Sequence, residues 1–141
     1  MKTLLQIYTE HVNPKSKKRY TDAEMLAGPS ARRGRHGNVP VVIDNIWFQS
    51  TGEGYYYLEL KERQNRMDIR EFKRQVPVEF FVHGVRIGKY IADFMTMDYA
   101  GNIEVIDYKS RHTVTLALYQ IKKALMLACY SVAIKEVGVK K

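Results

Sequence analysis

The pattern of hydrophobic and polar positions predicts an ordered region that begins near residue 39. Short β-branched or alternating runs predict strands, and longer runs with apolar residues three and four positions apart predict helices. The predicted elements are a hairpin over 41–48, a helix over 50–67, strands over 75–82, 87–98 and 103–109, a helix over 115–130 and a strand over 131–137. This order predicts an α/β fold in which a small mixed sheet packs against helices.

Local signals within this region set the expected boundaries and packing. Ser50, followed three residues later by Glu53, has the spacing of a capping box at the start of the first helix. The Ala100-Gly101-Asn102 segment predicts a tight turn between the second and third strands. In the last helix we expect an apolar stripe to face the core, formed by Leu118, Ile121, Ala124, Leu125 and Ala128.

Residues 1–38 differ from the rest of the chain in charge. They contain eight Lys or Arg residues against three acidic ones, and their helical periodicity is weak. We therefore expect residues 1–38 to form a basic N-terminal arm, with one short helix around Asp22–Leu26, and residues 39–141 to form the folded domain. A mobile, solvated tail is an alternative that is compatible with this reading, because basic arms often become ordered only on phosphate.

The composition narrows the classes of function. A chain of 141 residues has room for one domain, and its net charge of +8 indicates a polyanionic partner, most often nucleic acid. The single cysteine, Cys129, favours a reducing compartment such as the cytoplasm. No apolar run approaches the length of a transmembrane helix, and Met1–Tyr8 is too short for a secretory signal. We therefore expect neither secretion, nor membrane spanning, nor a disulfide scaffold.

Three residues on two neighbouring predicted strands form a candidate catalytic group. Asp107 and Lys109 stand two residues apart and hence on one face of their strand, and Asp93 interrupts an apolar run in the preceding strand. If the hairpin turns about residue 100, Asp93 and Asp107 face each other. Such facing carboxylates repel unless a divalent cation lies between them, and Mg²⁺ uses one or two carboxylates together with water and phosphate oxygens. For Asp107 and Lys109 alone, a surface ion pair is the alternative.

Glu53 is the fourth candidate. It shares with Tyr57 and Leu60 the helix face that we expect to point inward. The structural alternative is the capping box, in which Glu53 only satisfies the backbone N–H of Ser50. The two roles are compatible with each other.

Taken in order along the chain, these residues resemble the PD-(D/E)xK nuclease superfamily. More narrowly, the chain resembles a small bacteriophage-type family of that superfamily, long catalogued as a domain of unknown function and related to Holliday-junction resolvases. The likeness covers roughly residues 36–137. The residues that carry it are His36-Gly37-Asn38, Asp44, Phe48-x-Ser50-x-x-Glu53, Tyr57-Leu58-Glu59-Leu60, Gln75, Phe80, Tyr90-Ile91-Ala92-Asp93-Phe94, Glu104-x-x-Asp107-Tyr108-Lys109, Lys122 and Lys123.

The resemblance implies a restriction-endonuclease-like sheet flanked by helices and a metal-dependent endonuclease that hydrolyses DNA phosphodiester bonds. Its catalytic residues map to Glu53, Asp93, Asp107 and Lys109. Asp93 and Asp107 are expected to hold one or two Mg²⁺ ions, for which Mn²⁺ substitutes, and Glu53 to orient a bound water or help bind a second ion. Lys109 is expected to position or deprotonate the attacking water and to offset charge on the phosphate.

The same resemblance implies branched DNA as the partner and a homodimer in the cytoplasm, that of the bacterial host if a phage encodes the chain, because two symmetric cuts need two active sites. A general or nicking duplex endonuclease and a non-catalytic nucleic-acid-binding protein remain the alternatives. For Lys122 and Lys123, a solvated helix face is equally compatible with the sequence. The residues expected to contact nucleic acid are Lys17, Lys18, Arg19, Arg32, Arg33, Arg35, Lys122 and Lys123.

Overall fold

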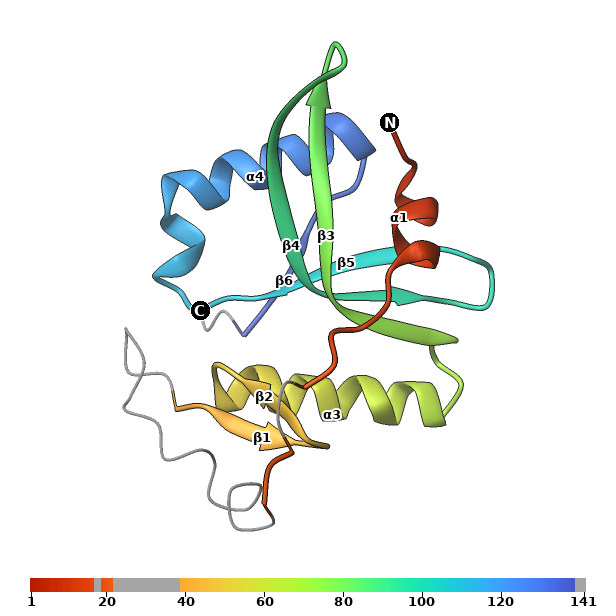
Figure 1. Cartoon of the computed structure of the whole chain (residues 1–141), viewed down its shortest axis with the longest axis vertical. Helices are drawn as coiled ribbons and strands as arrows, with labels where there is room; N and C mark the ends of the chain where they lie inside the picture. Colours follow the sequence, from red (N-terminus) through yellow and green to blue (C-terminus); the bar gives the residue numbers. More distant parts are fainter. Residues whose placement is uncertain (17–18, 22–38, 139–141) are drawn as a thin grey trace. The chain divides into compact units, whose positions relative to one another are not determined.

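A computed structural model describes residues 1–16, 19–21 and 39–138 of the chain (Figure 1). The chain divides into two compact units, one formed by residues 1–13 and 64–141 and the other by residues 14–63. Each unit is described by itself below. Among the described residues, no helix combines the length and the apolar character needed to cross a membrane.

The unit formed by residues 14–63 contains the predicted hairpin and the first predicted helix. Strands β1 (Val41–Ile43) and β2 (Ile46–Phe48) pair antiparallel. Asp44 and Asn45 between them both have positive φ, as a two-residue type I′ turn requires. Helix α3 (Thr51–Asn65) follows directly. Both predictions are thereby confirmed, although the helix ends two residues earlier than expected.

The first turn of α3 explains one of the two glycines that flank Glu53. The side chain of Ser50 accepts a hydrogen bond from the Glu53 backbone N–H at 3.2 Å, which is one half of the predicted capping box. A Cβ atom on Gly54 would lie 2.6 Å from Cγ1 of Val41 on β1. Glycine at residue 54 is therefore needed for the hairpin to pack closely against the helix.

The larger unit is built on a four-stranded sheet with the strand order β3-β4-β5-β6. The first three strands are antiparallel, and β6 pairs with β5 in the parallel direction. This mixed sheet, with helices packed against it, confirms the predicted α/β fold class. The strands are β3 (Glu71–Val82), β4 (Val85–Met97), β5 (Ile103–Tyr108) and β6 (Lys135–Val137).

Helix α4 (Ala117–Tyr130), which follows a short 3-10 turn at Thr113–Thr115, covers one side of this sheet. The expected apolar stripe is wrong at Leu118, Ile121, Ala124 and Ala128, which are exposed, whereas Leu125 packs against the core as expected. Tyr119 and Met126 are the buried positions of the helix. The helix is apolar on nearly all sides, so its periodicity alone does not select the face that packs. Met126 of α4 belongs to the same core cluster as the sheet residues Val76, Val78, Phe80, Tyr90, Ala92, Met95, Met97 and Val105.

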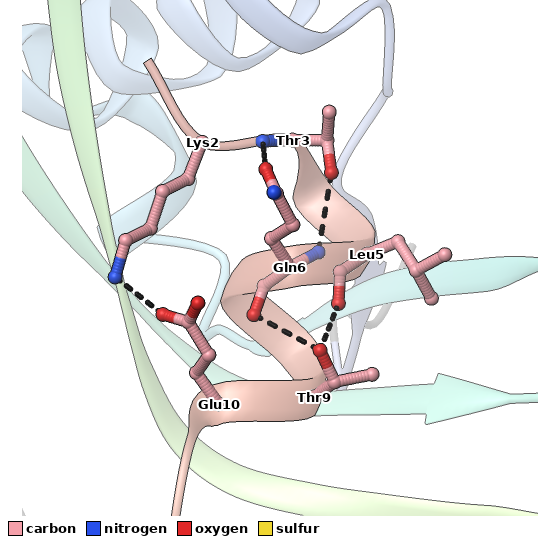
Figure 2. Close-up of polar contacts among 6 residues, drawn as sticks. All are labelled: Lys2, Thr3, Leu5, Gln6, Thr9 and Glu10. Atoms are coloured by element: carbon pink, nitrogen blue, oxygen red, sulfur yellow. Dashed lines mark hydrogen bonds and ion pairs between the residues drawn. The ribbon is translucent and has the colours of Figure 1, made fainter.

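The N-terminal segment also belongs to this core. Helix α1 (Leu4–Glu10) places Tyr8, which is fully buried, among the core residues of the sheet. Figure 2 shows the capping box that starts α1, in which the Gln6 N–H donates to Thr3 Oγ1 at 3.2 Å and the Thr3 N–H donates to Gln6 Oε1 at 2.8 Å. The figure also shows Lys2 paired with Glu10.

The expectation of an arm from residue 1 is therefore wrong for the first 13 residues. A seven-residue helix is too short for periodicity to reveal it, and its signal is the Thr3-x-x-Gln6 spacing instead. The short helix expected around Asp22–Leu26 lies outside the described residues.

Candidate active site

The β4–β5 hairpin brings Asp93 next to Asp107. The Cα partners of the two strands follow the register expected for a turn about residue 100, and Phe94 stands opposite Ile106 at the end nearest the two carboxylates. One step further along, the backbone N–H of Tyr108 donates to Asp93 Oδ2 at 2.9 Å. The predicted proximity of the two acidic residues is confirmed.

A local irregularity in β3 and β4 explains why Asp93 lies at this place. Gln75, which stands opposite Asp93, has a φ of 52°, a left-handed conformation that breaks the regular strand. Its Nε2 donates to Asp93 Oδ1 at 3.4 Å. Ala92 and Met95 both lie in the core, although positions three apart face opposite sides of a regular strand. The change of face at residues 93 and 94 therefore directs Asp93 towards β5.

Asp107 is a buried carboxylate with few partners to offset the free-energy cost of burying its charge. The residue is 0% exposed, and neither of its oxygens accepts a hydrogen bond within the described part of the chain. Its Oδ1 lies 3.1 Å from Nζ of Lys109, an ion pair whose geometry does not make a hydrogen bond. The expectation that Asp107 and Lys109 share one face of β5 is confirmed, whereas the alternative of a surface ion pair is wrong for Asp107.

The electrostatics of this pair favour the protonated form of Asp107. Burial, followed by the proximity of the Asp93 carboxylate, raises the pKa of Asp107 from 3.8 to about 8, and the Lys109 ammonium offsets only part of this rise. In the absence of a cation, Asp107 therefore keeps its proton over much of the neutral range. A second positive charge beside the two carboxylates is what the site lacks.

The polar cluster also contains Glu136 and Tyr119, which the sequence analysis did not assign to the site, and Lys123, which it assigned to nucleic-acid binding. Glu136 on β6 stands beside Asp107 in the parallel register and forms an ion pair with Lys123 of α4. The ring of Tyr119, also on α4, lies 5.3 Å from Nζ of Lys109. These contacts depend on the β5–β6 pairing and on how α4 packs. The sequence pattern gave no signal for Glu136 or Tyr119, whereas Lys123 was already predicted as a nucleic-acid contact.

The remaining predicted site residues are placed as follows. Glu53 lies on α3 in the other unit, so its participation in the site stays a prediction. Lys123 belongs to the polar cluster, Lys122 precedes it on α4, and Arg19 belongs to the other unit. Lys17, Lys18, Arg32, Arg33 and Arg35 lie outside the described residues.

The carboxylate pair fits a hard divalent cation. No group of three or more His, Cys, Asp or Glu side chains with metal-binding geometry occurs in the described ranges. Mg²⁺ does not need one, because it retains several waters and binds through one or two carboxylates. The two unsatisfied oxygens of Asp107 and the half-buried Asp93 supply such donors. These carboxylate oxygens could hold Mg²⁺ or Mn²⁺, which both prefer oxygen ligands.

Comparison with known proteins gives one result. A family model described as "Protein of unknown function (DUF1064)" matches residues 33–137, a range that includes Asp93, Asp107, Lys109 and Glu53. No curated protein and no solved structure matches the chain.

Proposed function

The chain belongs to the DUF1064 family, a family of unknown function, and from this premise we propose that it is a metal-dependent endonuclease that hydrolyses DNA phosphodiester bonds, with a preference for branched DNA such as a Holliday junction. The observation that carries the proposal is the environment of the Asp107 carboxylate. A fully buried carboxylate without hydrogen bonds, beside a second carboxylate and a lysine, destabilises the fold. Such an arrangement is typical of a site kept for function rather than for stability.

The proposed roles follow from the positions of the side chains. Asp93 and Asp107 would hold the cation, and Gln75 and the Tyr108 N–H orient the Asp93 carboxylate. When bound there, a divalent cation would make a water molecule nucleophilic at neutral pH. The Lys109 ammonium stabilises the negative charge that develops on the phosphate, where an oriented cation acts mainly on the transition state. No serine or cysteine nucleophile is required by this chemistry.

The proposed partner is DNA, and the charge of the chain supports this choice. The net charge of +8 favours binding to a polyanion. The preference for a junction and a homodimeric state are parts of the proposal that rest on the family resemblance and on the need for two symmetric cuts. Glu53 is proposed as a further acidic group of the reaction.

Cleavage assays test the reaction. Purified protein is incubated with four-way junction, flap, nicked and linear duplex DNA in the presence of Mg²⁺ or Mn²⁺. We expect paired nicks on opposing strands of the junction that EDTA abolishes. We expect no cleavage by Asp107→Asn or Asp93→Asn, both of which retain DNA binding because the basic residues are unchanged. Asp98→Asn, at the opposite end of the same hairpin, is the matched control and keeps full activity.

Each outcome of these assays discriminates. Full activity of folded Asp107→Asn protein would remove the proposed site. Binding of DNA without cleavage of any substrate by the wild-type protein would favour the non-catalytic alternative. Equal cleavage of linear duplex by a monomer would favour a general duplex endonuclease over a resolvase. Loss of activity in Glu53→Gln would support the separate role proposed for Glu53.

Salt titration tests whether the basic residues between positions 17 and 35 contribute to DNA binding. Replacing Lys17, Lys18, Arg19, Arg32, Arg33 and Arg35 by Gln leaves α1 and its buried Tyr8 in place, which a deletion from residue 1 would remove. If about five of these residues contact phosphate, the slope of log K against log[salt] becomes shallower by about 4 to 5. The slope is measured by fluorescence anisotropy on a labelled junction. An unchanged slope would assign DNA binding to other residues.

A further inference from the structure

Tyr119 is a buried aromatic residue that the main hydrophobic core does not use. It lies in the first turn of α4 and is 6% exposed. It is not part of the cluster in which Phe80, Tyr90 and Met126 pack together. Its ring instead lies between charges, with Nζ of Lys109 5.3 Å and Nζ of Lys123 5.9 Å from the ring centroid. Two ammonium groups within reach of one ring indicate a role for the ring in electrostatics.

We propose that Tyr119 is a positioning residue whose aromatic face holds the Lys109 ammonium beside Asp107; this inference rests on the proposed function and deepens it. Two interactions attract the Lys109 ammonium, an ion pair with Asp107 Oδ1 at 3.1 Å and a cation–π contact with the ring of Tyr119. The first depends on the charge of Asp107. The second does not, because the quadrupole of the ring is independent of what the carboxylate binds.

The need for the second attraction follows from the chemistry of the pair. Under the proposed function, the Asp107 carboxylate would be committed to a cation. Its ion pair with Lys109 would then weaken, and the neighbouring cation would repel the ammonium. The ring then remains to keep the ammonium near the reacting phosphate. Without it, the long lysine side chain has rotamers that carry its charge into solvent.

The surroundings of Tyr119 fix the ring in place. The pair of Lys123 and Glu136 stands beside it, and Glu136 is aligned with Asp107 across the β5–β6 register. Burial and the negative charges of Asp107 and Glu136 raise the pKa of the Tyr119 hydroxyl, so it stays neutral. Nζ of Lys109 lies over the ring, and the Tyr119 hydroxyl makes no hydrogen bond within the described part of the chain, so the aromatic face is the part of Tyr119 that acts on Lys109.

The experiment compares variants that separate the ring from the hydroxyl. Tyr119→Phe keeps the aromatic face, whereas Tyr119→Leu and Tyr119→Met remove it and leave apolar volume. Two replacements without a ring guard against the failure of one of them to fold. Tyr130→Leu is the matched control, because Tyr130 lies on the same helix and contacts the carbonyl oxygen of Glu79 instead.

The first readout does not depend on catalysis. With selective ¹³C labelling of lysine ε-carbons, NMR relaxation reports the order of the Lys109 side chain in the metal-free protein, and Lys109→Arg assigns its signal. We expect wild-type order in Tyr119→Phe and Tyr130→Leu and a clear loss of order in Tyr119→Leu and Tyr119→Met. Unchanged order in the folded variants without a ring would overturn the proposal.

The second readout is the division of the effect between kcat and KM for junction cleavage. Tyr119→Leu lowers kcat about tenfold while KM changes less than about twofold, and Tyr119→Phe stays within about twofold of the wild type in both. Equal losses in the Phe and Leu variants would assign the hydroxyl or the packing, and would overturn the role of the ring. If the wild-type protein cleaves no DNA, the proposed function fails, and the relaxation data alone decide whether Tyr119 positions Lys109.

Discussion

Each end of the β4–β5 hairpin carries an aspartate, and the two aspartates differ in hydrogen bonding, burial and pKa. At the turn, Asp98 Oδ1 accepts hydrogen bonds from the backbone N–H groups of Ala100 and Asn102, at 2.9 and 2.8 Å, and Oδ2 accepts one from Asn102 Nδ2. These bonds lower the pKa of Asp98. At the other end, Asp107 is buried without a hydrogen bond, and its pKa is raised.

The contrast indicates that Asp98 stabilises the folded state, whereas Asp107 destabilises it. Asp98 closes the turn that joins the two strands. Asp107 opposes folding whenever it is ionised, because a buried charge without adequate partners costs several kcal/mol. The four predictions below test this division.

The largest expected effect comes from Lys109, the cation that partly compensates Asp107. Lys109→Ala lowers the cleavage rate by about 10²- to 10⁴-fold, because an oriented charge near the phosphate acts in the transition state. Lys109→Arg does not restore full activity, since a planar guanidinium reaches differently and cannot act as a base. Steady-state kinetics and calorimetry with Mn²⁺ check this prediction. Lys135→Ala, which removes a surface pair with Glu104, is the control, and collapse of metal affinity in Lys109→Ala would contradict the assigned role.

The second prediction concerns the pH dependence of stability in the metal-free protein. Between pH 3.8 and about 8 the folded state holds a proton on Asp107 that the unfolded state has released, so the free energy of unfolding falls as the pH rises through this window. Asp107→Asn removes this slope and is more stable than the wild type by about 1–3 kcal/mol at pH 9. Urea denaturation at several pH values measures both. If the free energies of unfolding of the two proteins changed with pH in parallel, ionisation of Asp107 would not destabilise the folded state.

Much of the sheet could be predicted from the sequence because its signals are local. The alternation in β4 and β5 and the turn at Ala100-Gly101-Asn102 sufficed to predict the register near Asp93 and Asp107. The extent of helix α4 was predicted, but its buried face was not. Apolar residues lie on most sides of the helix, and only the tertiary packing determines that Tyr119 and Met126 are buried. Helix α1 was missed because seven residues are too few for a periodic pattern.

The candidate site was predictable only where its residues share one hairpin. Asp93, Asp107 and Lys109 were identified from spacing and resemblance, whereas Tyr119 and Glu136 were not. Their positions depend on the parallel pairing of β6 with β5 and on the packing of α4, which join segments that are distant in sequence. The left-handed conformation of Gln75 is likewise a consequence of tertiary structure, since glutamine has no intrinsic preference for it.

The third prediction is that a bound divalent cation offsets the loss of folding stability that the buried Asp107 carboxylate causes. At a free concentration of 10 times its Kd, Mg²⁺ or Mn²⁺ raises the free energy of unfolding by about 1.4 kcal/mol. Differential scanning fluorimetry with and without the metal detects the shift. Asp98→Asn retains the response and Asp107→Asn loses it. A response that persists in Asp107→Asn would place the cation elsewhere, and a loss in Asp98→Asn would assign it to the turn.

The smallest expected effect is at the turn itself. Asp98→Ala removes the hydrogen bonds that close the hairpin and lowers the midpoint of thermal unfolding by about 2–5 °C at neutral pH. Because the pKa of Asp98 is lowered in the folded state, its stabilisation is present above the ordinary carboxyl range and is lost as the pH falls below it. The difference between Asp98→Ala and the wild type therefore disappears in acid, whereas the advantage of Asp107→Asn grows towards alkaline pH. Thermal scans of both variants from pH 3 to pH 9 measure these opposite trends, and trends of the same sign would contradict the distinction between the two ends of the hairpin.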